Sequence, residues 1–309
     1  MNISITSVGT ATAIGIIKCL RKINEKINIL GLDINDYGYT AGSVLCDKYH
    51  KSLSYNNQNY IDNLVSILSN EKIDILIPVH DFEIKKIALN IERFKGIQVI
   101  LPNIDSVDLF SDKYLSCKAL NGIGIDIPKI VSDDYKNKKI ARKRICVGSK
   151  GIRILQNNQK CILDDDEFLQ EYIDGEEYTV DILSDLSGKP IIIIPRQRLE
   201  VKAGVATKIK IVYDEKLINI CKRILKNFLI PGLCNIQFIK KNDIYYFIEL
   251  NPRFGGASVS SILASYNYIE NFINLKSIVS SEELLNENLK KVKWGSIITR
   301  YYQEVMYIG

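Results

Sequence analysis

The sequence contains little of the chemistry on which acid–base hydrolases, membrane proteins and disulfide-rich domains depend. Its 309 residues include only two histidines, His50 and His80, and no Ser/His/Asp set stands in a recognisable motif. No apolar run approaches the roughly 20 residues of a membrane-spanning helix. The seven cysteines occur singly, without a Cys-x-x-Cys pair. These absences argue against a hydrolase, a protein that spans a membrane, a zinc site and a disulfide scaffold.

What remains is the composition of a soluble globular protein. Hydrophobic residues make up 46% and charged residues 25% of the chain, which is typical of proteins with a substantial core. The first residues, 1–6, lack a basic segment and predict a strand, not a signal peptide. Single cysteines suit reduced thiols in a cytoplasmic protein. The net charge of +5 is spread along the chain, so it favours anionic small molecules over nucleic acid.

Residues 1–108 alternate between apolar strands and amphipathic helices, which predicts a parallel sheet with helices on both faces. The expected strands are Ile3–Val8, Ile27–Asp33, Ile73–Pro78 and Gln98–Leu101, and the expected helices are 11–23, 60–69 and 82–93. The first turn holds Gly9 and Gly15, and Asp33 ends the second strand, as in dinucleotide-binding folds. The Gly-x-Gly-x-x-Gly spacing is absent, however, so NAD is not the favoured ligand.

The rest of the chain predicts a mixed α/β arrangement. A helix is expected to begin at Ser111-Asp-Lys113, with Ser111 as its N-cap, and short antiparallel strands are expected from residue 127. The later predicted elements are strands at 177–183 and 191–196, helices at 215–229 and 259–275, and a final strand at 294–306.

A predicted β-hairpin near the C-terminus carries the densest group of polar residues. Two strand-like stretches flank the turn-forming triplet 241–243. Side chains alternate along a strand, so Glu249 and Asn251 point to one side while Ile248 and Leu250 point to the other.

The first strand of this hairpin adds a third polar side chain. If Lys240 pairs with Ile244, Gln237 lies on the same side as Glu249, one diagonal step away. Carboxylate and amide oxygens that converge in this way suit a hard divalent cation such as Mg²⁺, which takes few carboxylates and shares phosphate oxygens. Gln237, Glu249 and Asn251 are therefore predicted to bind a metal ion.

Arg253 follows this group directly and is held in place by Pro252. Its guanidinium can bind a phosphoryl oxygen through two hydrogen bonds. Gly255-Gly256 are expected to open a helix, whose N–H groups suit an anion. A buried strand has no structural need for all these groups together, so a binding site is favoured over a polar turn.

Three upstream stretches suit a nucleotide and an anionic substrate. Residues 142–144 place cations before a glycine-bearing turn, where backbone N–H groups can cover phosphates, although a solvated basic loop explains this stretch equally well. The backbone at Glu171 and Ile173 suits an adenine edge, with an acid beyond the turn for ribose hydroxyls, and a charged hairpin turn is the alternative. Arg196 and Arg198 share one face of a strand and suit an anion.

In this order and spacing the features resemble the ATP-grasp superfamily, most closely single-chain ligases similar to the large subunit of carbamoyl-phosphate synthase. The resemblance covers nearly the whole chain and is strongest at 170–181 and 235–256. It implies an α/β protein with an ATP-grasp fold. The implied parts are a Rossmann-like pre-grasp domain at 1–108, a small lid subdomain at 109–175 and a C-terminal mixed α/β domain with the metal site at 176–309.

The resemblance also assigns roles to individual residues. The ATP-binding set would be Lys113, Arg142, Gly148, Ser149, Gly151, Glu171, Ile173 and Glu177, with Glu171 and Ile173 at adenine and Glu177 at the ribose. The metal set would be Gln237, Glu249 and Asn251, and the catalytic set Arg253, Arg196 and Arg198, with Arg253 beside the transferred phosphate. The stretch from Gly151 to Glu171 is shorter than usual for the family, so the lid is expected to lack a helix.

The implied activity is ATP-dependent ligation. A carboxylate attacks the γ-phosphoryl group of ATP bound with Mg²⁺ (or Mn²⁺), and an amine then displaces phosphate from the acylphosphate. The expected partners are the small-molecule carboxylate and amine, with no nucleic acid or membrane, and a homodimer is one assembly that this allows. His80-Asp81, at a predicted strand end, could touch substrate. Two other classes stay open: a carbamoyl-phosphate-type kinase of carbamate or bicarbonate, and a non-catalytic nucleotide-binding regulatory protein.

Overall fold

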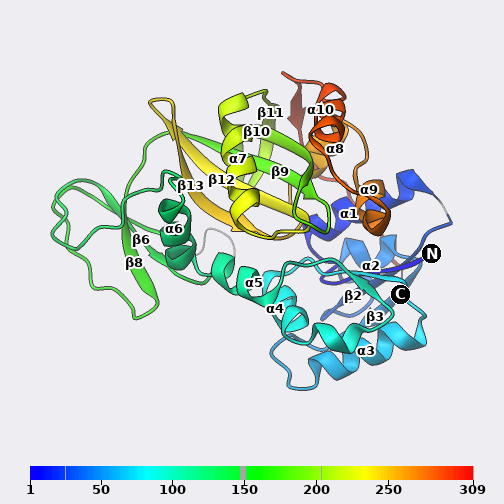
Figure 1. The fold of residues 1–309 in the computed structure, drawn as a ribbon. Coiled ribbons are helices and arrows are strands. Elements are labelled where there is room, and N and C mark those ends of the chain that lie inside the picture. The colour runs from blue at the N-terminus through cyan, green and yellow to red at the C-terminus, as the bar shows by residue number, and fades with distance from the viewer. Residues whose placement is uncertain (25, 147–150, 203, 309) are drawn as a thin grey trace.

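The computed structural model describes residues 1–24, 26–146, 151–202 and 204–308, which form three sheets with their helices (Figure 1). A five-stranded parallel sheet lies within residues 2–99, a three-stranded sheet within 139–171 and a six-stranded sheet within 176–299. We call the parts built on these sheets the N-terminal, middle and C-terminal units. The predicted mixed α/β architecture is confirmed. Among the described residues no helix has both the length and the apolar character needed to cross a bilayer.

The N-terminal sheet is parallel throughout, in the order β3-β2-β1-β4-β5. Its strands are β1 (Asn2–Ile5), β2 (Asn28–Asp33), β3 (Lys48–Lys51), β4 (Ile75–Ile77) and β5 (Gln98–Val99), and its main helices are α1 (Ala11–Ile23), α3 (Tyr60–Asn70) and α4 (Asp81–Leu89). The winding reverses between β1 and β4, which opens a crevice at the carboxyl ends of these two strands. Asp33 accepts hydrogen bonds from the N–H of Gly9 (2.8 Å) and from Asn35, so its carboxylate supports the first turn.

The sequence missed three elements in this half, which are α2 (Ala41–Leu45), β3 and α5 (Ile104–Ser111). Because α5 continues to Ser111, the prediction that Ser111 caps the next helix is wrong. Asp112 caps α6 (Lys113–Gly122) instead, and its carboxylate accepts the N–H groups of Tyr114 (2.9 Å) and Leu115 (3.0 Å). Two helices therefore meet at a single acidic residue.

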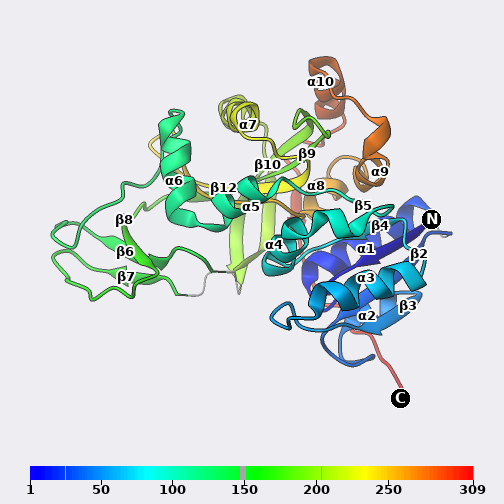
Figure 2. The ribbon, with the colours of Figure 1, turned by 60° about the horizontal axis from the view of Figure 1, so that its bottom comes forward.

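The middle unit is an antiparallel sheet in the order β7-β6-β8. Its strands are β6 (Lys139–Lys143), β7 (Arg153–Leu155) and β8 (Glu167–Glu171). The short stretch from Gly151 to Glu171 predicted a unit that lacks a helix, and the described part of residues 124–175 contains none. This unit projects from one end of the molecule, at the left of Figure 2.

The C-terminal sheet is antiparallel, in the order β13-β12-β9-β10-β11-β14. Its strands are β9 (Glu176–Ser184), β10 (Pro190–Lys202), β11 (Val205–Ile211), β12 (Gly232–Lys241), β13 (Ile244–Asn251) and β14 (Ile297–Thr299). Helix α7 (Glu215–Asn227) buries Leu217, Cys221 and Ile224 against one face, and α10 (Glu282–Lys290) packs against β10. The final strand is far shorter than predicted.

The long helix predicted at 259–275 is also wrong, because the segment breaks into α8 (Val259–Leu263) and α9 (Ile269–Ile273). Between them the Nδ2 of Asn267 donates to the carbonyl of Cys19 (2.8 Å), which ties the break to α1. Both short helices pack against α1. A Cβ added at Gly15 would lie 2.6 Å from Val259, so this glycine permits the close approach that fixes the N-terminal unit against the C-terminal unit.

The hairpin at the C-terminal edge has a different register from the prediction. Lys241 pairs with Ile244 across a two-residue turn, in which Asn242 (φ +49°) and Asp243 (φ +61°) adopt the left-handed conformation typical of tight hairpins. A bulge at Ile248 then shifts the pairing by one residue, so Gln237 lies directly opposite Glu249. The tighter turn and the bulge each shift the register by one residue, and together they turn the predicted diagonal neighbours into a facing pair.

The crevice between β1 and β4 contains a buried carboxyl group. Glu83, on α4, is 5% exposed and accepts hydrogen bonds from the hydroxyls of Thr6 (2.7 Å) and Ser7 (2.8 Å). Burial raises the pKa of Glu83 above its ordinary value of 4.5, although the two hydroxyls act in the opposite direction.

We expect Glu83 to make the protein less stable as the pH rises. A carboxyl group whose pKa is higher in the folded protein contributes stability that is present below pH 4.5 and is lost as the pH rises through the folded-state pKa. The free energy of unfolding of the wild type minus that of Glu83→Gln should therefore fall above this pH, by at most about 1.4 kcal/mol per pH unit. Urea titrations across pH measure this difference, which cancels the other titrating groups. A difference that is constant or grows with pH would contradict the expectation.

Candidate active site

The predicted metal-binding residues lie together at the end of β13. The Nε2 of Gln237 donates to Oε1 of Glu249 (2.9 Å), and the Nδ2 of Asn251 donates to the same oxygen (3.1 Å). The bulge at Ile248 makes this possible because it places Gln237 directly across from Glu249. To act as metal ligands the two amide groups would turn over and present their oxygens.

This group of donors fits a hard cation that is shared with phosphates. Among the residues that the structure describes, no three His, Cys, Asp or Glu side chains gather as metal ligands. One carboxylate and two amides suit Mg²⁺, which keeps waters and phosphate oxygens in its shell, better than they suit a metal held entirely by protein. A role for Asn235 was not predicted from the sequence. Asn235 is 3% exposed, and its Oδ1 accepts a hydrogen bond from Asn251 (3.3 Å) while its Nδ2 donates to the carbonyl of Arg253 (3.0 Å).

Two cations approach the same group from other elements. The Nζ of Lys113, at the start of α6, lies 3.7 Å from Oε2 of Glu249 and donates to the carbonyl of Cys146 (2.8 Å). Arg198, on β10, donates to Oε1 of Gln237 (3.1 Å) and lies 3.1 Å from Oε2 of Glu177. Burial lowers the pKa of Arg198, with a further lowering by Arg196, while Glu177 opposes both.

Arg253 is held by a residue from the N-terminal unit. Its Nε donates to Oδ1 of Asp81 (2.6 Å) and its Nη2 donates to Oδ2 (2.8 Å), a bidentate pair between residues 172 positions apart in sequence. Burial lowers the pKa of Arg253, but Asp81 and Glu249 together raise it, and the net shift is upward. Asp81 is the first residue of α4 and follows β4, at the carboxyl end of the parallel sheet where functional residues gather.

Arg196 has a different environment from Arg198, although both lie on β10. It is 3% exposed and donates from Nε to Oδ2 of Asp181 (2.7 Å). Asp181 also accepts hydrogen bonds from the hydroxyls of Ser258 and Ser261. This buried network holds the chain that follows Arg253. Arg196 therefore stabilises the site without facing it, whereas Arg198 contacts Gln237 of the predicted metal-binding group.

Arg142 stands apart from the other cations of its basic stretch. Lys143 pairs with Asp166 (3.1 Å) on the surface, and Arg144 pairs with the buried carboxylate of Asp112 (2.5 Å). Arg142 is 3% exposed, and its Nη1 donates to Oε1 of Gln170 (3.2 Å). Its Nε is buried without a hydrogen-bond partner among the described residues. A buried guanidinium donor is costly to leave unpaired, so this group suits an incoming anion.

Glu171, Ile173 and Glu177, three of the remaining predicted ATP-binding residues, lie along the junction between the middle and C-terminal units. Glu171 ends β8, and its Oε1 accepts the N–H of Lys129 (2.9 Å). Ile173 is half-buried in the link between β8 and β9. Glu177, near the start of β9, pairs with Arg198. Gly151 has a φ of +77°, which suits a glycine turn. The predicted residues Gly148 and Ser149 lie outside the described residues.

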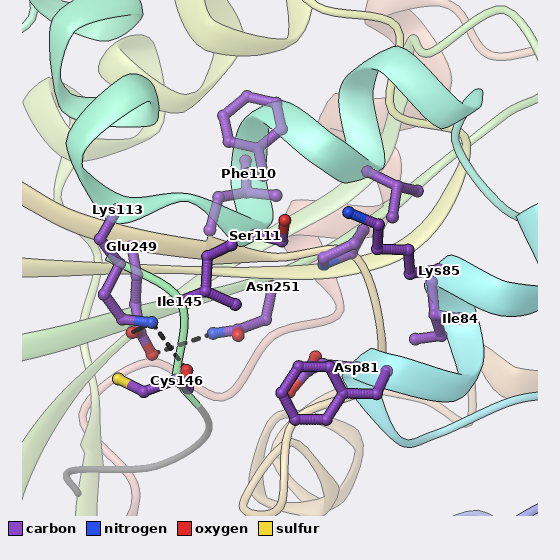
Figure 3. Close-up of a pocket in the computed structure, with 14 residues that line it drawn as sticks. Asp81, Ile84, Lys85, Phe110, Ser111, Lys113, Ile145, Cys146, Glu249 and Asn251 are labelled. Carbon is purple, nitrogen blue, oxygen red and sulfur yellow. Dashed lines mark hydrogen bonds and ion pairs between the residues drawn. The ribbon is translucent and has the colours of Figure 1, made fainter. Parts of the chain in front are cut away.

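A cavity of about 240 Å³ opens beside the metal-binding group (Figure 3). Its polar rim includes Asp81, Lys113, Glu249 and Asn251, and its apolar wall includes Phe82 and Phe110. The cavity joins α4 and α5 of the N-terminal half to the end of β13. This cavity could not be predicted from the sequence, because the residues of its two walls are about 150 positions apart in the chain.

Two family models match the chain. Residues 164–294 match the family described as ATP-grasp in the biosynthetic pathway with Ter operon, and residues 3–101 match the PylC-like N-terminal domain. The first match covers β13, with the predicted metal ligands, and most of the C-terminal sheet. The second covers the parallel sheet and Asp81.

Among curated proteins, the chain is similar to large chains of carbamoyl phosphate synthase. It is 27% identical over 217 residues to that of Thermoplasma volcanium, which covers 60% of this chain and 21% of the relative. It is 25% identical over 270 residues to that of Clostridium acetobutylicum, which covers 76% of this chain and 24% of the relative. The chain therefore spans less than a quarter of the length of these relatives.

Among solved structures, the fold is shared with carboxylases and synthetases. The biotin carboxylase domain dimer of Hydrogenobacter thermophilus 2-oxoglutarate carboxylase, in complex with MgADP, ADP and bicarbonate, has a TM-score of 0.71 at 15% identity and covers 92% of this chain and 72% of that one. Staphylococcus aureus N5-carboxyaminoimidazole synthetase has a TM-score of 0.69 at 12% identity and covers 88% and 76%. The ATP-grasp fold expected from the sequence is confirmed.

The unpaired Nε of Arg142 leads to a prediction for nucleotide binding. Arg142→Met keeps an apolar stem but removes the guanidinium, so binding of MgATP should weaken about tenfold to hundredfold, as expected for the loss of charge-assisted hydrogen bonds worth about 1.5–3 kcal/mol. Arg93→Met is the matched control, because its pair with Asp62 (2.6 Å) joins two exposed side chains and is worth about 1 kcal/mol or less. Isothermal titration calorimetry measures both affinities. Equal effects of the two substitutions would remove Arg142 from the nucleotide site.

Proposed function

Because the chain joins an ATP-grasp domain to a PylC-like N-terminal domain, we propose that it is an ATP-dependent ligase that joins a carboxylic acid to an amine. The observation that carries this proposal is the meeting of Glu249, Asn251 and Arg253 with Lys113 beside one cavity. A carboxylate with two amide neighbours, close to Lys113 and Arg253, suits a polyphosphate and its metal ion better than it suits acid–base chemistry at a neutral bond.

The proposed reaction has two displacements. An oxygen of the substrate carboxylate attacks the γ-phosphorus of ATP, the bond from that phosphorus to the β,γ-bridging oxygen breaks, and ADP leaves. The amine nitrogen then attacks the carbonyl carbon of the acylphosphate, inorganic phosphate leaves with the electrons of the C–O bond, and the nitrogen loses a proton. Both steps build negative charge on phosphoryl oxygens, so fixed positive charge accelerates them.

The residues divide this work by position. Gln237, Glu249 and Asn251 would hold Mg²⁺, or Mn²⁺ in its place, which when bound neutralises phosphate charge and polarises the γ-phosphoryl group. Arg253 would bind the transferred phosphoryl group, with Arg198 and Arg196 supporting the anionic intermediate from β10. Lys113, Arg142 and the turn with Gly148, Ser149 and Gly151 would bind the phosphates. Glu171 and Ile173 would meet adenine and Glu177 the ribose.

Two further properties accompany this proposal. We place the protein in the cytoplasm, where ATP and reduced thiols are found, and we propose small-molecule substrates with no nucleic acid or membrane partner. The similar biotin carboxylase domain is described as a dimer, and this favours a homodimer here.

A kinase of carbamate or bicarbonate is the second candidate, favoured by the similarity to carbamoyl phosphate synthase. It would use the same metal-binding group but would need no amine or organic acid. A non-catalytic regulatory protein would have no need for Gln237, Glu249, Asn251 and Arg253 in contact, so the third class is disfavoured.

The deciding experiment measures ADP release with MgATP and pools of carboxylic acids, in the presence and absence of amines, with bicarbonate as a separate substrate. Release that needs both an acid and an amine supports the ligase, and release with bicarbonate alone supports the kinase. Glu249→Gln should reduce turnover at least about hundredfold, since it removes the only carboxylate of the metal-binding group. Glu287→Gln, on the exposed face of α10, is the control. Turnover by Glu249→Gln close to that of wild type would remove Glu249 from the site.

Asp81 should act as a positioning residue for Arg253. Asp81→Asn keeps the shape but loses the bidentate charge pair, so kcat should fall about tenfold to hundredfold, while the KM for ATP changes little. Asp81→Glu should recover part of kcat, because it restores the charge. The control is Asp62→Asn, which breaks a surface pair with Arg93 (2.6 Å). A rise in KM for ATP with kcat unchanged would show that Asp81 acts on nucleotide binding instead.

A further inference from the structure

The cavity beside the metal-binding group has a polar rim and an apolar body. The apolar wall consists of Phe82, Ile84, Val107, Phe110, Ile145, Leu250 and Pro252. Ile84, Val107 and Phe110 are 1%, 3% and 4% exposed, so this part of the wall belongs to the protein core, whereas Ile145 is 45% exposed at the mouth of the cavity. In Figure 3, Phe110 and Ile84 lie away from Glu249 and Asn251, across the open space between them.

Apart from Lys113 and Glu249 at the rim, the charged side chains that line the cavity already have partners. Asp81 is paired with Arg253 (2.6 Å), and Lys85 with Asp108 (2.8 Å). The Oγ of Ser111 donates to the carbonyl of Asp108 (2.9 Å). A second charge or an amide on the body of a ligand would therefore be desolvated against an apolar wall, at a large cost.

The cavity is separate from the predicted adenine and ribose contacts. Glu171, Ile173 and Glu177 do not line it, whereas Lys113, Glu249 and Asn251 do. It therefore lies next to the end of the site where phosphate chemistry is proposed. A substrate in the cavity would present its reacting group at the polar rim and its body to the apolar wall.

Resting on the proposed ligase function, we propose that the carboxylic acid substrate is monocarboxylic and has an apolar body, aliphatic or aromatic. An apolar cavity of about 150 Å³ is known to accept benzene, so a cavity of about 240 Å³ has room for a ring or a branched chain of similar size. The carboxylate would lie at the rim with Lys113, and the body would lie between α4, α5 and β13. Each methylene buried in this way should tighten binding about fourfold.

Calorimetry with a non-hydrolysable ATP analogue and Mg²⁺ tests the cavity directly. The probes are acetate, butyrate, hexanoate and phenylacetate, with succinate and β-alanine as acids that carry a second charge. Affinity should rise from acetate to hexanoate and phenylacetate, and the doubly charged acids should bind at least tenfold more weakly than butyrate. Succinate or β-alanine binding as tightly as butyrate would overturn the proposal.

Variants assign the binding to this cavity. Ser111→Phe fills the space from the rim and should weaken binding of hexanoate at least tenfold, whereas Ser66→Phe, exposed on α3 away from the cavity, should leave it unchanged. Phe82→Ala removes a partly exposed side chain from the wall and should move the preference towards longer acids. This variant provides the test if Ser111→Phe does not fold. Identical acid preferences in all the folded variants would overturn the assignment.

The same acids in the ADP-release assay separate this proposal from the ligase. Apolar acids that bind but never stimulate ADP release, with any amine, would refute the ligase and leave the cavity assignment in place. Release driven only by small or doubly charged acids would support the ligase and refute the cavity assignment. If butylamine and hexylamine bind with the same response to Ser111→Phe while the acids do not, the cavity belongs to the amine, and the proposal is wrong.

Discussion

The ion pair between Arg253 and Asp81 joins the end of β13 to the start of α4. Everything that we assign to the site depends on this junction, because the metal-binding strand and the crevice of the parallel sheet belong to different units of the protein. The pair spans 172 residues of sequence. It fixes the guanidinium through two hydrogen bonds, which a lysine could not reproduce with the same planarity. The apolar cavity lies directly beside it, bounded by both units.

The electrostatic design around Glu249 follows from the same junction. One carboxylate receives two amide N–H groups and faces Lys113 at 3.7 Å, while Arg198 reaches it through Gln237. The neighbouring charges balance, because Arg198 is paired with Glu177 and Arg253 with Asp81. A divalent cation bound at Glu249 would add positive charge, which phosphates would offset. Asp81 neutralises Arg253 without reducing the charge on Lys113.

The sequence predicted the parts of this site that lie within one strand, because side-chain alternation is a local property. Glu249 and Asn251 were predicted in this way, and Arg253 was predicted from its place directly after Pro252. The pairing of Gln237 was predicted two residues out of register. The turn pairs Lys241 with Ile244, and a bulge at Ile248 adds one more residue without a sequence signal. The contact with Asp81 could not be predicted, since nothing in a single sequence links residues that far apart. Likewise, α5 was missed because its eight residues are short for a periodic signal.

The division between the two units has a consequence for specificity. The charged groups that would act on phosphates come mainly from β10, β13 and the start of α6, whereas the apolar wall comes mainly from α4 and α5. Substitutions in the wall change the volume available to a substrate by methylene-sized steps, each worth about 0.8 kcal/mol of transfer free energy. The described partners of Glu249 are Gln237, Asn251 and Lys113, none of which lies on α4 or α5. A protein built in this way can change the acid that it recognises without disturbing the groups that would activate it.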